Sequence, residues 1–176
     1  GQAVSAISFV DPAGKVVSLK DFVGTPMLVN LWATWCAPCV AEMPTLDALA
    51  VRDEGRLVVL PVSQDLEGAA KVDPFFANAR FKALKPYRDP QAALSIDYEA
   101  NLPTTILYDS SGKEVWRMMG GMDWTSVWGH ESARPRHVAA GEVWARRGRL
   151  QELPLEAVPD GRHGLDICVG TRVGPA

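Results

Sequence analysis

Two cysteines separated by two residues, Cys36 and Cys39, constrain this chain more than any other feature of its sequence. They stand between residues 27–33, a run that is apolar at every position except Asn30, and residues 37–52, where apolar side chains recur at three- and four-residue spacing. The run predicts a buried strand, and the spacing predicts a helix that packs one face on a core. The pair therefore lies at a strand-to-helix junction. It could be a structural disulfide, half of a metal site or a reversible redox couple.

The segments around this junction alternate between strand and helix patterns. Residues 104–109 and 114–119, joined by a short Ser-Ser-Gly turn, predict a hairpin at the end of the series. Strands that alternate with helices and end in a hairpin favour an α/β fold with a mixed sheet flanked by helices. Pro44 falls inside the predicted helix and should kink it. The remaining predicted strands are residues 5–10 and 15–19 around a turn, 56–64 and 83–89, and the remaining helices are 68–80 and 91–100.

The overall composition is typical of a soluble globular protein. The chain has 176 residues, of which 47% are hydrophobic and 22% are charged, and this is enough to bury a core. Its formal net charge of -3 gives no reason to expect nucleic acid or an anionic membrane surface as a partner. No apolar run approaches the roughly 20 residues of a membrane span. We expect any signal peptide or membrane anchor to lie upstream of this chain.

The composition changes after Trp124. All six lysines precede this residue, whereas all three histidines follow it, together with seven arginines, seven glycines and four prolines. We therefore expect residues 1–124 to form the folded domain, with a last helix that extends further. Residues 125–176 would then be the rest of that helix and an atypical tail, either poorly ordered or encoded after a loss of reading frame. We assign no chemistry to this tail.

The junction favours redox chemistry for the two cysteines. A helix N-terminus presents unpaired N–H groups and the positive end of its dipole to the first sulfur. In such motifs the thiol pKa falls to about 3.5–7.5, from about 8.5 in free cysteine. Cys36, as the thiolate, is therefore predicted to be the nucleophile, and Cys39 the resolving thiol. Pro38 suits an early helical position, where its missing N–H costs little.

The other two interpretations of the pair have less support. A zinc site needs four ligands, and the only further candidates are Cys168 and three histidines far along the chain, in no zinc-binding pattern. A structural disulfide that closes so short a loop adds the least chain-entropy stabilisation of any bridge. Cys168 is left over, either incidental or a site of unwanted intermolecular pairing. We therefore expect no metal, and no cofactor besides a redox-active Cys36–Cys39 disulfide.

Four segments resemble the thioredoxin superfamily, and specifically the TlpA/ResA/CcmG-like thiol-disulfide oxidoreductases, which are related to AhpC/TSA. These segments are GKVVSLKDFVGTPMLVNLWATWC, CVAEMP, NLPTTILYDSSGKEV and GGMDW, and the resemblance that they carry covers roughly residues 5–124. The resemblance implies a thioredoxin-like fold for residues 1–124. A central mixed sheet would carry an N-terminal hairpin extension, and residues 125–176 would follow as the atypical tail.

The resemblance also implies a substrate-binding surface around the first sulfur. Pro103 would be the family's cis-proline and would pack against the disulfide, and the backbone at Leu102 would pair with an extended substrate segment beside Cys36. The alternative for Pro103 is an ordinary loop proline before a strand. Trp35 would shield the sulfurs and offer an apolar platform to the substrate, and Pro38 would adjoin it.

Glu42 is the predicted proton acceptor. It lies three residues after Cys39, so a helix places both side chains on one face. The resemblance implies that Glu42 deprotonates the resolving thiol, with a pKa raised by desolvation; the alternative is a solvated helix glutamate. Asn30 stands where thioredoxin-type relatives carry a buried aspartate, and it cannot accept a proton in the same way. Trp32 is expected in the core, and Trp124 at the start of the last helix.

As a function, the resemblance implies a protein thiol-disulfide oxidoreductase in the bacterial periplasm or at the outer face of the cytoplasmic membrane. It would act as a monomer that reduces protein disulfides such as those of apocytochrome c before haem attachment. A membrane thiol-disulfide reductase would supply its electrons. An oxidant role is the near alternative. A copper or haem chaperone on the same fold is disfavoured because no histidine precedes residue 130, and a peroxide-reducing antioxidant protein is a weaker option still.

Overall fold

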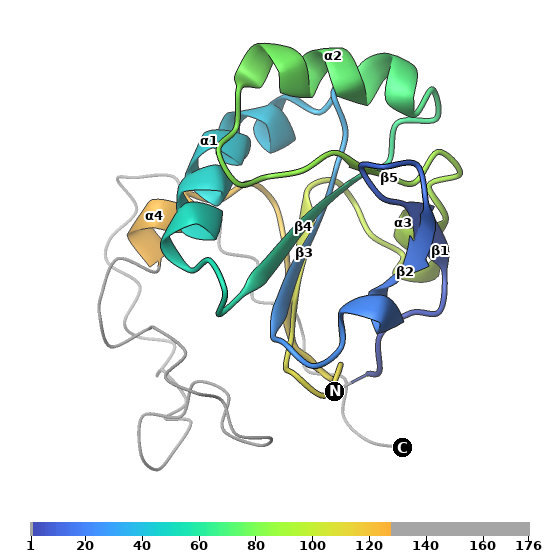
Figure 1. Cartoon of the computed structure of the whole chain (residues 1–176), viewed down its shortest axis with the longest axis vertical. Helices are drawn as coiled ribbons and strands as arrows, with labels where there is room; N and C mark the ends of the chain where they lie inside the picture. The colour runs from blue at the N-terminus through green and yellow to red at the C-terminus, as the bar shows by residue number, and fades with distance from the viewer. Residues whose placement is uncertain (1, 128–176) are drawn as a thin grey trace, which may run out of the picture.

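The computed structural model describes residues 2–127 and consists of one mixed sheet with helices on both faces (Figure 1). The sheet has seven strands in the order β2-β1-β5-β4-β3-β6-β7. The predicted mixed sheet and the two predicted hairpins are therefore confirmed. The strands are β1 (Ser8–Val10), β2 (Val16–Ser18), β3 (Met27–Trp32), β4 (Val58–Ser63), β5 (Tyr87–Arg88), β6 (Thr104–Tyr108) and β7 (Glu114–Met119).

Strand β3 lies at the centre of the fold. It pairs in parallel with β4 and antiparallel with β6, and all six of its residues are buried. One face of β3, with Leu28 and Trp32, packs on the cluster that also holds the buried side of helix α1 (Ala37–Arg52), Val72 and Trp124. Val72 belongs to α2 (Ala69–Ala79), and Trp124 begins α4 (Trp124–Val127). Helices α1, α2 and α4 therefore cover one face of the sheet.

The other face of β3 packs against a second cluster. Met27, Val29 and Leu31 contact side chains from β1, from the 3₁₀ helix η1 (Leu19–Phe22) and from α3 (Ala93–Asp97). In Figure 1, α3 accordingly lies near the β1–β2 hairpin, on the opposite side of the strands from α1 and α4. Because both faces are covered, a continuous apolar strand is favoured over an alternating one.

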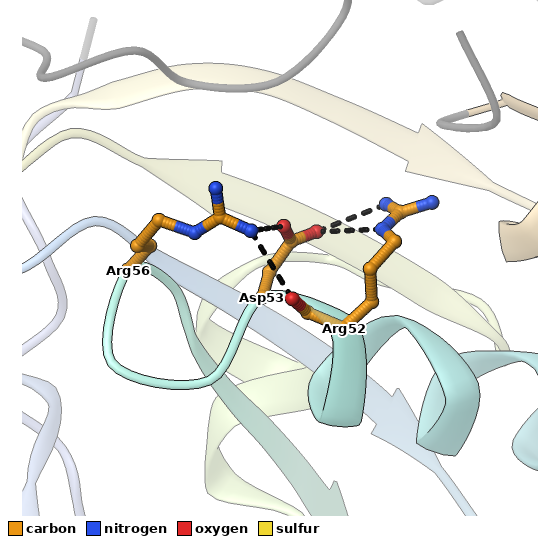
Figure 2. Close-up of polar contacts among 3 residues, drawn as sticks. All are labelled: Arg52, Asp53 and Arg56. Carbon is orange, nitrogen blue, oxygen red and sulfur yellow. Dashed lines mark hydrogen bonds and ion pairs between the residues drawn. The ribbon is translucent and has the colours of Figure 1, made fainter. Parts of the chain in front are cut away.

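The start and the end of α1 are defined by different interactions. Cys36 is the N-cap residue, and Pro38 occupies an early helical position. At the other end, the carboxylate of Asp53 is 1% exposed and accepts bonds from the guanidinium groups of Arg52 (2.9 Å) and Arg56 (2.7 Å). Arg56 also donates to the Arg52 carbonyl oxygen at 3.1 Å (Figure 2). These contacts connect the last turn of α1 to the turn that leads into β4.

Most predicted elements occur where the sequence placed them, and three are much shorter. The predicted strand 5–10 reduces to Ser8–Val10. The predicted strand 83–89 reduces to Tyr87–Arg88, which pairs through two residues with β4 and one with β1. The predicted helix 91–100 reduces to Ala93–Asp97. Helix α1 contains Pro44 without interruption, and the expected kink stays a prediction. The predictions for residues 128–176, Cys168 included, lie outside the described residues. Within residues 2–127, no helix combines the length and the apolar character needed to cross a membrane.

Candidate active site

Cys36 and Cys39 form a disulfide at the N-terminus of α1. Their sulfur atoms are 2.05 Å apart and their Cα atoms 5.2 Å apart. Cys39 is fully buried, whereas Cys36 keeps 6% of its surface exposed. Pro38, between them, is exposed. Of the two sulfurs, an attacking group from solvent therefore meets that of Cys36 first.

The loop before Cys36 is held by the end of the neighbouring strand. The backbone N–H and the hydroxyl of Thr34 donate to the Asp65 carboxylate at 2.9 and 2.6 Å. The Ser63 hydroxyl donates to the same carboxylate at 2.7 Å, and Asp65 is only 2% exposed. Trp35 lies between Thr34 and Cys36 and is 72% exposed, which leaves its indole free to meet a substrate. Sequence reasoning missed Asp65, although a polar triplet directly after a buried strand was a visible signal.

Glu42 is buried inside the fold rather than solvated. It is 3% exposed and accepts three hydrogen bonds: from Asn30 Nδ2 (2.8 Å), from the Met122 backbone N–H (2.9 Å) and from Trp124 Nε1 (3.2 Å). Burial raises the pKa of the Glu42 carboxyl, and these hydrogen bonds offset only part of that increase. A raised pKa is the change expected from the sequence for a carboxyl that accepts the proton of Cys39.

One short segment, residues 120–124, contacts several parts of this site. The Gly120 N–H donates to the Pro103 carbonyl at 2.8 Å. At Gly121 an added Cβ would lie 3.3 Å from the carbonyl oxygen of Pro38, so the backbone passes close to the cysteine motif. Met122 and Trp124 then reach Glu42. Sequence reasoning used this segment for the resemblance and for the start of the last helix, but it could not place the segment at the site, because its contacts depend on how the chain returns to α1.

The Leu102–Pro103 peptide bond is cis, as the resemblance implied. Pro103 is buried, and half-buried Leu102 packs on the cluster that includes both cysteines. Trp32 is fully buried and Trp124 begins α4, so both expectations for these tryptophans are confirmed. The pairing of a substrate with Leu102 and the apolar platform at Trp35 stay predictions.

Comparisons with known proteins agree with this arrangement. The family model described as Redoxin matches residues 1–133. The chain is 35% identical over 130 residues to the thiol:disulfide interchange protein DsbE homolog of Paracoccus denitrificans (strain Pd 1222), covering 68% of this chain and 66% of that protein. It is 30% identical over 110 residues to the thiol-disulfide oxidoreductase ResA of Bacillus thuringiensis (strain Al Hakam), covering 62% and 64%. The chain thus spans slightly less than two thirds of these relatives.

A solved structure gives the same result for the fold. The crystal structure of the exposed lipoprotein thioredoxin Etrx1 from Streptococcus pneumoniae strain TIGR4 superposes with a TM-score of 0.60 and 26% sequence identity. The superposition covers 70% of this chain and 95% of that one. The chain belongs to the Redoxin family and has a thioredoxin-like fold, and it is similar to thiol-disulfide oxidoreductases of the DsbE and ResA type.

Proposed function

We propose that the protein catalyses thiol-disulfide exchange through Cys36 and Cys39 and that it reduces disulfides of protein substrates. One observation carries the proposal: Cys36, with 6% of its surface exposed, is the N-cap of α1, and a buried carboxyl, Glu42, lies one turn beyond its partner Cys39. The names of the two relatives, an interchange protein and an oxidoreductase, support the same chemistry.

The exchange begins when the Cys36 thiolate attacks one sulfur of the substrate disulfide. The substrate leaves one sulfur as a thiolate, and Cys36 is joined to the other in a mixed disulfide. Cys39 then gives its thiol proton to Glu42, and the resulting thiolate attacks the Cys36 sulfur. The substrate departs as a dithiol after proton uptake, and Cys36–Cys39 is left oxidised. Two electrons have moved to the substrate, so a reductant must restore the dithiol.

We further propose that the protein works on the outer side of the bacterial cytoplasmic membrane, with apocytochrome c disulfides as substrates and a membrane thiol-disulfide reductase as electron donor. The relatives named DsbE and ResA support this assignment. Equilibration with a glutathione redox buffer tests the direction of transfer. A reduction potential near about −270 mV fits a reductant, and one near about −120 mV would assign the protein to disulfide formation instead.

The thiolate of Cys36 is the premise of this chemistry. In a Cys168→Ala background, the ultraviolet absorbance of the thiolate in the reduced protein reports the two motif cysteines, and a Cys39→Ala variant isolates Cys36. We expect the pKa of Cys36 well below the value of about 8.5 for free cysteine, because it caps a helix N-terminus. An ordinary thiol pKa at this position would remove the proposed nucleophile.

Replacing Glu42 tests its assigned role. Glu42→Gln should slow the resolution of the mixed disulfide at neutral pH by about 100-fold, a value typical of a lost general base. Single-turnover reduction of a disulfide-bonded peptide, quenched and analysed by mass between pH 5 and pH 9, should then reveal substrate trapped on Cys36. Glu54→Gln, at an exposed position just beyond α1, is the matched control. An unchanged pH profile in Glu42→Gln would exclude Glu42 from proton transfer.

A further inference from the structure

The surroundings of Glu42 consist of hydrogen-bond donors. Oε1 accepts from Asn30 Nδ2, and Oε2 accepts from the Met122 backbone N–H and from Trp124 Nε1. In the part of the chain that the structure describes, no charged side chain contributes to this set: the partners come from β3, from the backbone before α4 and from an indole ring. Cys39 is the titratable group on the same face of α1. Three donors on two oxygens match an ionised carboxylate, which accepts hydrogen bonds and donates none.

Protonation of Glu42, the step assigned to it in the proposed function, changes this balance. One oxygen becomes a hydroxyl, and a buried hydroxyl needs an acceptor. A backbone N–H and an indole N–H can only donate, whereas an asparagine amide carries both donor and acceptor atoms. Among the three partners, only Asn30 can therefore receive the proton of Glu42 in a hydrogen bond.

Asn30 holds an unused acceptor. The residue is fully buried, and among residues 2–127 its Oδ1 atom has no hydrogen-bond partner, although its Nδ2 donates both to Glu42 and to the Thr105 hydroxyl at 2.9 Å. A buried polar atom without a partner is uncommon in folded proteins and calls for an explanation. Protonation of the neighbouring carboxyl supplies one, because it creates a donor at the position that Nδ2 now faces.

We propose that Asn30 is a positioning residue whose side-chain amide turns over when Glu42 takes up its proton, so that Oδ1 and Nδ2 exchange places. Oδ1 then accepts from the Glu42 hydroxyl. The Thr105 hydroxyl, which accepts from Nδ2 in the ionised state, turns to donate to Oδ1. Asn30 thus keeps its hydrogen bonds to Glu42 and to Thr105 in both states: it donates both when Glu42 is ionised and accepts both when Glu42 is protonated. A single proton moves, from Cys39 to Glu42, and no other bond is made or broken.

This role explains why an amide suits position 30. An aspartate there would put a second carboxylate against Glu42, and two adjacent carboxylates cannot both ionise easily. It would also leave the ionised Glu42 without the donor at Oε1. An apolar residue would offer neither the donor nor the acceptor. Of these three side chains, only the amide supports both protonation states of Glu42 at this position.

Nuclear magnetic resonance of the oxidised, full-length protein tests the rotation directly, since neither Cys36 nor Cys39 titrates in that form. The chain has three asparagines, and Asn78 and Asn101 are exposed, so they serve as internal references under selective nitrogen labelling. Above the Glu42 midpoint, we expect a through-hydrogen-bond coupling between Asn30 Nδ2 and the Glu42 carboxyl carbon. Below the midpoint this coupling should vanish. A coupling that persists while the carboxyl carbon titrates would refute the rotation.

Substitutions give a second measurement with a matched control. Trp124→Phe removes a donor to Oε2 whose hydrogen bond is stronger when the carboxyl is ionised, so it should raise the pKa of Glu42. Asn30→Leu removes a donor to the ionised form but also the acceptor for the hydroxyl of the protonated form, and these two losses oppose each other, so it should shift that pKa less than Trp124→Phe does. Trp116→Phe, in a ring that stacks on Trp124 at 6.5 Å between centroids, should leave it unchanged. A larger shift in Asn30→Leu than in Trp124→Phe would mean that Asn30 serves only as a donor.

These measurements require no exchange activity, so the two proposals fail separately. An amide that keeps its orientation would overturn the role of Asn30, even if the enzyme still reduces disulfides with Glu42 as its base. If instead Glu42→Gln leaves the exchange kinetics unchanged, the base is lost from the proposed function, although the amide still turns with the carboxyl.

Discussion

The Asp47 carboxylate connects α1 to the chain between α2 and β5, and its removal should destabilise the fold measurably. Asp47 is 8% exposed and accepts hydrogen bonds from three consecutive backbone N–H groups, those of Lys82, Ala83 and Leu84, at 2.9–3.1 Å. A hydrogen bond to a charged group contributes about 1.5–3 kcal/mol. Because the Lys82 end of this segment is exposed and can be rehydrated, we expect Asp47→Ala to cost about 3–4 kcal/mol rather than the full sum.

The pH dependence gives this prediction a clear sign. Burial acts to raise the pKa of Asp47, but the three backbone N–H donors and the charge of Lys82 outweigh burial and lower it. A carboxyl with a lowered pKa in the folded state stabilises the protein above its unfolded-state pKa of about 3.9. This contribution disappears as the pH falls through the lower, folded-state pKa. Asp47→Asn keeps an acceptor oxygen and loses the charge, so it should cost about 1–2 kcal/mol at pH 7.

Urea unfolding of the oxidised protein between pH 2.5 and pH 7 provides the assay. The difference in unfolding free energy between the parent and Asp47→Asn should be largest near pH 7 and should disappear at the acid end. Glu54→Gln, at an exposed position on the adjoining turn, should follow the parent throughout. A cost below about 1 kcal/mol for Asp47→Ala would refute the hydrogen-bond argument, and a gap that does not change with pH would refute the electrostatic one.

Two further substitutions follow from the same contacts. Thr34→Val removes one donor to buried Asp65 and should lower the free energy of unfolding by about 1 kcal/mol. Because this loop precedes Cys36, the substitution should also slow reduction of the disulfide by dithiothreitol. An unchanged rate would show that the loop does not position Cys36. Asp53→Ala removes a buried carboxylate that binds two guanidinium groups and should cost about 2–3 kcal/mol in urea unfolding. Arg56→Ala removes a half-exposed partner of Asp53 and should cost less than about 1 kcal/mol. Equal costs for Asp53→Ala and Arg56→Ala would contradict the greater weight given to the buried carboxylate.

The local pattern predicted the centre of the fold well. The apolar run that became β3 and the spacing that became α1 both reflect burial, which residue type and periodicity report directly. Helix α1 accordingly has the predicted bounds, Ala37–Arg52. The hairpin of β6 and β7 was equally visible because a turn joins two extended, apolar segments.

Elements with few contacts of their own were predicted less well. Strand β5 contains two residues, Tyr87 and Arg88. Its length is set by the neighbouring strands, because β4 pairs with both residues and β1 with Arg88 alone. The pattern of residues 83–89 carries no sign of where that pairing ends. Helix α3 is shorter than predicted for a related reason: β-strand and helix ends depend on tertiary contacts more than on local preference.

The sequence by itself determined the position of the cysteine pair at a strand-to-helix junction and the placement of Glu42 one turn beyond it, since both follow from local periodicity. Only the tertiary structure decided what surrounds Glu42. Asn30, Thr105 and Trp124 lie 12, 63 and 82 residues from Glu42 along the chain, a separation over which helix and strand periods carry no information. They meet because β6 pairs with β3, and because α1 and the start of α4 pack together on one face of that sheet. Because these side chains are buried where the elements meet, their polar groups must form hydrogen bonds with one another rather than with water.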